Sequence, residues 1–136
     1  MPILEVHLVE GMHTPAQHSE LLSAMSTRYA ELLGWPLDGV RAWVTLHRPE
    51  LWATAGTPAS SRSAPYFTAM VLEGRPVEQR RRLLGDFTDI VVDVLGVDRR
   101  LVHGRIIPVH PDDWATGGVS GGARRGDPRT RLATSG

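Results

Sequence analysis

The sequence predicts an α/β (α+β) domain made of two tandem β-α-β units, with a four-stranded sheet and two helices on one face. One observation is that apolar residues alternate in four short segments and recur at helical spacing in two longer ones. The other is an internal repeat at an offset of 62 residues, in which Trp52-Ala-Thr-Ala-Gly56 aligns with Trp114-Ala-Thr-Gly-Gly118. Such a recurrence in register indicates two copies of one structural unit.

The first unit is expected to contain a strand, a helix and a second strand. Apolar and more polar residues alternate from the chain start to Leu8, which predicts the first strand. Pro2 is compatible with this strand, because proline is tolerated at the first position. Thr14-Pro15 is a typical helix opening, and Gly34 is a typical helix end. The second strand covers 40–46. The apolar residues of the helix recur at helical spacing and are Leu21, Leu22, Met25, Tyr29, Leu32 and Leu33.

The second unit repeats this order. A third strand is predicted over 65–74, a helix from Pro76 to Gly96 and a fourth strand over 101–109. We therefore predict one domain over residues 1–118, with repeat units at about 2–56 and 65–118. Residues 119–136 are rich in Gly and Arg, which predicts a flexible tail.

The face of the sheet without helices is expected to be too apolar for water. The strand residues assigned to it are Ile3 or Leu4, Trp43, Phe67 or Met70, and Ile106. Burial of this face against other subunits is the simplest solution, so the sequence predicts an oligomer.

Composition excludes several classes of function. Fifteen basic residues balance fifteen acidic ones, which argues against nucleic-acid binding. Cysteine is absent, so thiol nucleophiles and thiolate metal sites are excluded, and the six histidines form no metal-binding motif. No apolar run is long enough to span a membrane and no signal pattern is present, so we expect a cytoplasmic protein without membrane partners.

Pro2 is the first candidate for chemistry. All basic residues are arginines, so amine chemistry requires the N-terminus. Removal of Met1 would make Pro2 a secondary amine, whose pKa lies far below that of lysine and falls further in an apolar site. Such an amine is suited to act as a general base or nucleophile. Pro65 aligns with Pro2 at an offset of 63, but its nitrogen is an amide, so one such proline is expected per chain. The alternative is that Pro2 serves only to permit removal of Met1.

The chain resembles the tautomerase superfamily over residues 2 to about 118. The resemblance rests on Pro2 at the start of the first strand, the doubled β-α-β unit, Glu73-Gly74-Arg75 after the third strand, and the 114–118 turn. It implies a mixed sheet in which the first and third strands are antiparallel, so that the start of one meets the end of the other. It also implies a homotrimer with a catalytic N-terminal proline.

Members with a doubled unit resemble malonate semialdehyde decarboxylase and the cis-3-chloroacrylic acid dehalogenase group. The decarboxylase pattern matches here at Asp38, His47-Arg48-Pro49, Arg75-Pro76 and Asp113-Trp114. The second arginine of these patterns is missing, since Val77 and Leu72 occupy its positions. Tyr29 stands in place of a helix histidine and Arg105 in place of a strand-four tyrosine. Arg105 or Arg41 is a candidate for the second charge.

The remaining candidates each have a functional and a structural interpretation. Arg75 would hold a substrate carboxylate at a helix N-terminus, or pair with nearby glutamates. Asp38 would be an acid–base partner or a turn residue, and Tyr29 would contact substrate or belong to the core. Trp114 would wall the pocket or pack at a turn. His103 and Arg105 alternate onto one strand face and would line the pocket.

We therefore predict a cofactor-independent tautomerase or isomerase, without a metal, in which Pro2 moves a proton on a small oxo- or enol carboxylate held by Arg75. The first alternative is a decarboxylase, hydratase or dehalogenase acting on a three-carbon oxo or unsaturated acid. The second alternative is a non-catalytic trimeric binding or structural protein.

Overall fold

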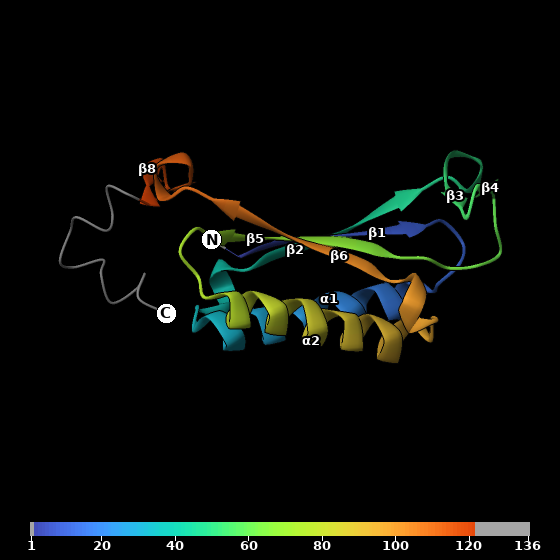
Figure 1. Cartoon of the computed structure of the whole chain (residues 1–136), viewed down its shortest axis with the longest axis horizontal. Coiled ribbons are helices and arrows are strands. Elements are labelled where there is room, and N and C mark those ends of the chain that lie inside the picture. The colour runs from blue at the N-terminus through green and yellow to red at the C-terminus, as the bar shows by residue number, and fades with distance from the viewer. Residues whose placement is uncertain (1, 122–136) are drawn as a thin grey trace.

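The computed structural model describes residues 2–121 and contains the two expected β-α-β units (Figure 1). The first unit consists of β1 (Ile3–Val9), α1 (Pro15–Leu33) and β2 (Arg41–His47). The second consists of β5 (Tyr66–Leu72), α2 (Val77–Leu95) and β6 (His103–Val109). The predicted fold class is confirmed: both helices lie on one face of a four-stranded sheet.

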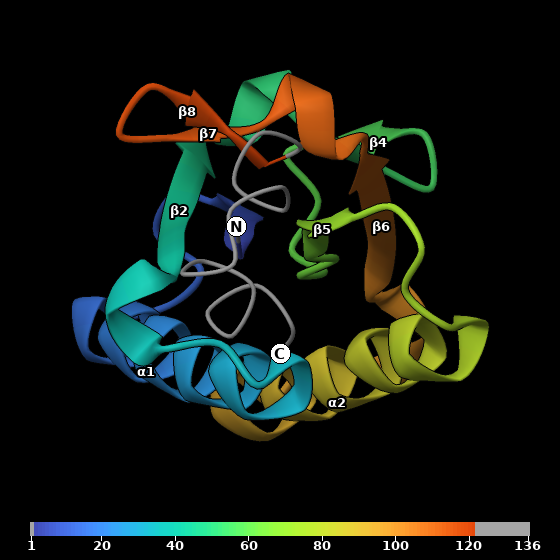
Figure 2. The same ribbon diagram turned by 90° about the vertical axis from the view of Figure 1, so that its left-hand side faces the viewer.

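The two units join through their first strands. The strand order is β2-β1-β5-β6; β1 is parallel to β2, and β5 is parallel to β6. The central pair is antiparallel, with Ile3 opposite Met70 and His7 opposite Tyr66. The sheet is therefore mixed, and the start of β1 lies beside the end of β5. Figure 2 looks onto this end, where the N-terminus lies between β2 and β6.

The two helices begin differently, although the units are copies of each other. Thr14 caps α1 through a capping box, in which its hydroxyl accepts from the Gln17 N–H and the Gln17 side chain accepts from the Thr14 N–H. α2 begins at Pro76, which makes no side-chain cap. Both helices end at a glycine in the left-handed conformation, Gly34 and Gly96.

The core lies between the sheet and the helices. Three aromatic rings form its centre: Phe87 meets Tyr29 edge-on at 5.2 Å and Phe67 at 5.7 Å between ring centroids. All three side chains are fully buried. The strands contribute alternate residues, namely Leu4, Val6 and Leu8 from β1 and Phe67, Ala69 and Val71 from β5.

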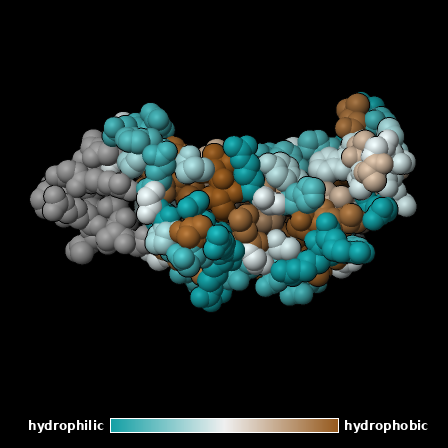
Figure 3. All heavy atoms as spheres, viewed as in Figure 1, coloured by the Kyte–Doolittle hydropathy of each residue, from teal (hydrophilic) through white to brown (hydrophobic). Residues whose placement is uncertain are grey.

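The opposite face of the sheet is open and mixed in polarity. Glu5 accepts a hydrogen bond from the Thr45 hydroxyl at 2.6 Å, and His7 bonds His47 at 2.8 Å between ring nitrogens. Trp43 on β2 is 42% exposed. Ile106, which was expected on this face, packs against the core instead. Figure 3 shows hydrophobic residues reaching the surface along the middle of the molecule, above the hydrophilic residues of the helix layer.

Two small hairpins rise from opposite ends of the sheet, on the side away from the helices (Figure 1). One pairs β3 (Ala53–Thr54) with β4 (Thr57–Pro58), and the other pairs β7 (Ala115–Thr116) with β8 (Val119–Ser120). The tail boundary expected after residue 118 thus falls inside the second hairpin, and the remainder of the predicted tail, 122–136, lies outside the described residues. None of the helices within residues 2–121 has the length and apolar character needed to cross a membrane.

Candidate active site

Pro2 lies buried at the start of the central strand β1. Its carbonyl accepts from the Arg41 N–H at 3.0 Å, which ties it to β2. On the other side, the antiparallel register with β5, extended by one residue beyond Ile3 and Met70, places Pro2 opposite Val71. Pro2 is thus enclosed by strands on both sides, at the end of the sheet where β5 stops.

Tyr29 lies beneath this end of the sheet, on the helix side. Its side chain is fully buried, and its hydroxyl donates to the carbonyls of Met70 and Ile3, the residue that follows Pro2. Burial raises the pKa of the Tyr29 phenol above its usual range, although the bond with Ile3 and the charge of Arg75 oppose this rise. Tyr29 is therefore a neutral donor that contacts the strand next to Pro2.

Arg75 reaches the same region from the loop between β5 and α2. Its Nη1 donates to the Leu33 carbonyl at 3.4 Å and to the Gln79 side-chain oxygen at 3.2 Å. Leu33 is the last residue of α1, where the helix dipole favours a cation. The antiparallel joining of β1 and β5 thus brings the candidate amine and the candidate carboxylate-binding residue to one end of the sheet.

A cleft of about 300 Å³ opens beside Arg75 at the start of α2. It is lined by the end of β5, by Glu73, Gly74 and Pro108, and by a second arginine, Arg80. The Nε of Arg80 donates to the Arg75 carbonyl at 3.3 Å. A run of three arginines such as 80–82 would ordinarily be a solvated helix face, but Arg80 is half-buried while Arg81 and Arg82 are exposed.

Asp38 and Trp114 also belong to this end. Asp38 lies in the short 3-10 turn Leu37–Gly39 that leads into β2, is exposed, and its carbonyl accepts from Arg41 Nη1 at 2.6 Å. Trp114 follows β6, whose end lies beside the end of β5. Its indole nitrogen is buried, and among residues 2–121 it has no hydrogen-bond acceptor. An acceptor on a bound molecule would satisfy it.

Comparison with known proteins gives a consistent result. A family model described as "Tautomerase enzyme" matches residues 65–124, the second unit. The structure of a fused 4-OT solved as a symmetric trimer is 28% identical, with a TM-score of 0.80, and the match covers 89% of this chain and 97% of that one. A native fused 4-OT is 26% identical over the same shares, with a TM-score of 0.82. The second unit thus matches the tautomerase family, and the whole domain shares the fold of the fused 4-OT proteins.

Two more distant structures share the tautomerase fold. Pt0534, solved after inactivation by 2-oxo-3-pentynoate, is 22% identical with a TM-score of 0.83, covering 89% of this chain and 97% of that one. A member of the cis-3-chloroacrylic acid dehalogenase family is 18% identical with a TM-score of 0.78, covering 87% of this chain and 82% of that one.

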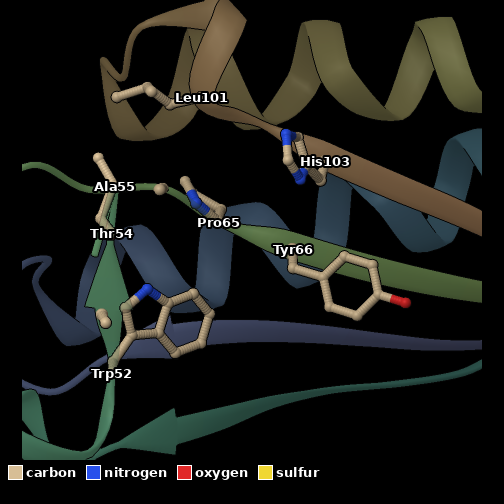
Figure 4. A pocket seen from close by; sticks show the side chains of 9 residues that line it. Trp52, Thr54, Ala55, Pro65, Tyr66, Leu101 and His103 are labelled. Carbon is tan, nitrogen blue, oxygen red and sulfur yellow. The ribbon is translucent and has the colours of Figure 1, made fainter. Parts of the chain in front are cut away.

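The other end of the domain is built around Pro65. His103 donates its N–H to the Pro65 carbonyl at 3.0 Å, as Arg41 does to Pro2. A second cleft of about 300 Å³ lies there, with Trp52 and His103 on either side of Pro65 and the Tyr66 ring directed away (Figure 4).

Two candidates from the sequence therefore lie away from Pro2 within one chain. His103 starts β6 beside Tyr66, at the far end of the sheet, and Arg105 lies opposite Thr68 in the middle of it. Both side chains are exposed. Residues 2–121 contain no group of three or more His, Asp or Glu side chains arranged to hold a metal ion.

Proposed function

We propose that the chain is a cofactor-independent tautomerase in which the N-terminal amine of Pro2 transfers a proton on a small oxo- or enol carboxylate. Arg75 holds the substrate carboxylate. The observation that carries this proposal is that Pro2 and Arg75 lie at the same end of the sheet, where the Tyr29 hydroxyl bonds the carbonyl of Ile3, the residue after Pro2.

The surroundings of Pro2 favour a neutral amine. Removal of Met1 turns its nitrogen into a secondary amine, and burial together with a nearby arginine disfavours the charged form of such a group. A neutral amine near pH 7 takes a proton from an enol hydroxyl and returns it to the neighbouring carbon, which converts the enol to the ketone. Activity is then lost as the pH falls below the pKa of the amine.

Arg75 is suited to the second role. A guanidinium binds a carboxylate through two parallel hydrogen bonds. The adjacent N-terminus of α2 carries no side-chain cap, so its N–H groups add favourable potential for an anion. The first unit lacks both the uncapped helix start and the arginine. Thr14 caps α1, and the loop before α1 contains Met12 and His13 where the second unit has Arg75.

Covalent labelling with 2-oxo-3-pentynoate tests the proposal. The neutral nitrogen of Pro2 adds to the alkyne carbon farther from the ketone, which forms one N–C bond. The amine proton ends on the other alkyne carbon, and no group leaves. Intact mass and N-terminal peptide mapping should show one molecule of the acid on Pro2, with Met1 absent. The rate of labelling should fall at low pH.

Two variants make the result specific. Arg75→Ala should label at least about tenfold more slowly at low reagent concentration, because a charge-assisted pair to the carboxylate is lost. Pro65→Ala should label like the wild type, since Pro65 has an equivalent place but an amide nitrogen. A chain that retains Met1, or a free Pro2 that never reacts, would refute the proposal and favour a non-catalytic protein.

Lyase or hydratase chemistry on a short oxo or unsaturated acid is a second candidate, supported by the placement of Asp38. Asp38 is exposed in the turn that precedes β2, at the Pro2 end of the sheet, and its carboxylate would position a water molecule in such a reaction. Under this alternative Asp38→Asn abolishes turnover but leaves labelling of Pro2 unchanged. Under the tautomerase proposal, Asp38→Asn changes turnover and the labelling of Pro2 only slightly.

We also propose that the chain forms a homotrimer. The open sheet face exposes a large hydrophobic side chain, that of Trp43, which lies beside Glu5 and is 42% exposed. Similar fused 4-OT proteins were solved as trimers. In a trimer, His103 and Arg105 could serve a site only as residues of a neighbouring subunit. Sedimentation equilibrium tests the assembly, and a monomer at micromolar concentration would contradict it.

A further inference from the structure

Two glutamines in equivalent positions make the same bond between the helices. Gln17 donates from Nε2 to the Val94 carbonyl at 3.2 Å, and Gln79 donates from Nε2 to the Leu32 carbonyl at 2.9 Å. Each glutamine thus ties the first turn of its own helix to the last turn of the other helix. As far as the helix packing is concerned, the two residues are equivalent.

Their side-chain oxygens do different things. Gln17 Oε1 accepts from the Thr14 N–H at 2.9 Å and completes the cap of α1. The residue at the same place before α2 is Pro76, which has no N–H to donate. Gln79 Oε1 instead accepts from Arg75 Nη1 at 3.2 Å.

We infer that Gln79 is a positioning residue that holds Arg75 ready for a carboxylate, and that Pro76 permits this by leaving the Gln79 oxygen without a capping bond. The inference rests on the proposed function of Arg75. An arginine side chain loses considerable conformational freedom when it binds, so holding it in place beforehand raises affinity without any new contact to the ligand.

The inference predicts different effects for the two glutamines. Gln79→Met removes the helix tether and the bond to Arg75, whereas Gln17→Met removes an equivalent tether and a helix cap. Both variants should lower the melting temperature. Only Gln79→Met should weaken binding of a small carboxylate, by about tenfold, because one hydrogen bond that orders a charged group is lost.

Pro76→Thr gives a test in which stability and binding change in opposite directions. It restores an N–H and a hydroxyl at the cap, so that Gln79 can form the capping box seen at α1. The melting temperature should not fall, but Gln79 is drawn away from Arg75, and carboxylate binding should weaken severalfold. A purely structural role for these residues does not predict weaker binding in a chain of undiminished stability.

The measurement is inactivation by 2-oxo-3-pentynoate over a range of concentrations, which separates the half-saturating concentration from the maximal rate. Gln79→Met should raise the half-saturating concentration about tenfold and leave the maximal rate, which reports on Pro2, within about twofold. Gln17→Met should change neither. Equal shifts in the two methionine variants, or no shift in Gln79→Met, would overturn the inference.

A second measurement separates this inference from the proposed function. The Nη signals of Arg75 in ¹⁵N spectra, assigned with Arg75→Lys, should show slow rotation and slow hydrogen exchange in the wild type and in Gln17→Met, and faster rotation and exchange in Gln79→Met, because Gln79 accepts from Nη1. If the wild-type chain is never labelled at Pro2, the proposed function fails while these spectra still decide whether Gln79 holds Arg75. An Arg75 signal unchanged in Gln79→Met refutes the role of Gln79 directly.

Discussion

Gly104→Ala should destabilise the chain, although glycine in a strand is ordinarily the less stable choice. Gly104 on β6 lies beside the buried Phe67 on β5, and a side chain at 104 would point to the same face of the sheet as Phe67. A Cβ on Gly104 would lie 2.6 Å and 2.7 Å from two ring carbons of the fully buried Phe67. Ordinary carbon contacts are about 3.5–4 Å, so the ring would have to move within a packed core. We expect a loss of about 1–3 kcal/mol in the free energy of unfolding.

The first unit shows how this clash is avoided elsewhere. At the equivalent position Leu4 on β1 lies beside Ala42 on β2. Leu4 is smaller than Phe67, and this leaves room for Ala42, which is larger than Gly104. The double variant Phe67→Leu with Gly104→Ala recreates that pair in the second unit. Its cost should be smaller than the sum of the single costs by at least about 1 kcal/mol, as expected for residues in direct contact.

Urea unfolding followed by circular dichroism, at one protein concentration to hold any assembly constant, measures these free energies. Gly85→Ala is the matched control. Gly85 lies within α2 and a Cβ there meets no atom within 4 Å, so alanine should stabilise by about 0.5–1 kcal/mol. The reasoning fails if Gly104→Ala stabilises the chain like Gly85→Ala, or if the double variant is simply additive.

Three further outcomes are expected. Tyr29→Phe should lower the free energy of unfolding by only about 1 kcal/mol and leave inactivation by 2-oxo-3-pentynoate unchanged, because the Tyr29 hydroxyl bonds strand carbonyls. Weaker binding of the reagent in this variant would instead show that the hydroxyl contacts the ligand. Arg80→Ala should raise the half-saturating concentration of that reagent, while exposed Arg81→Ala should not. The Thr45 hydrogen bond holds the pKa of Glu5 below its ordinary value of 4.5. The ionised Glu5 carboxylate therefore stabilises the fold above pH 4.5, and this stabilisation is lost as the pH falls through the lowered pKa. Thr45→Val should make the acid dependence of unfolding shallower.

The sequence predicted the elements well, because their ends carry distinct local chemistry. Thr14-Pro15 opens α1, and Gly34 and Gly96 end the two helices in the left-handed conformation. The repeat then fixed the matching strands, whose observed ends lie within two residues of the predicted ones. The small hairpins after β2 and β6 were expected only as turns, since strands of two residues carry no periodic pattern.

The faces of the strands were harder to predict. Ile106 and Ile107 are adjacent and equally apolar, so alternation alone could not decide which of them faces the core. In the structure Ile106 packs against the core, on the side where Gly104 makes room for Phe67. Packing against a particular neighbour, rather than hydrophobicity, decides the orientation of this edge strand.

Predicting the site required knowing which strand ends meet. Pro2 and Arg75 come together because β1 and β5 are antiparallel, an arrangement that only the family resemblance implied. The same arrangement sends His103 to the Pro65 end, since β6 starts where β5 starts. Alternation placed His103 on a face but could not place it at an end. Arg80 was missed for a similar reason, as a run of three arginines does not reveal which one turns toward a cleft.

The two ends of the sheet show how a duplicated framework can acquire one specialised site. At the Pro65 end, Thr14 and Gln17 complete the cap of α1 through a capping box. At the Pro2 end, Pro76 breaks that rule and α2 begins without a side-chain cap. The lost cap costs about 1 kcal/mol of helix stability, but it leaves the Gln79 oxygen available to accept from Arg75. A local departure from helix-forming chemistry, in one copy only and beside the candidate amine, is the pattern expected where function rather than stability determines the sequence.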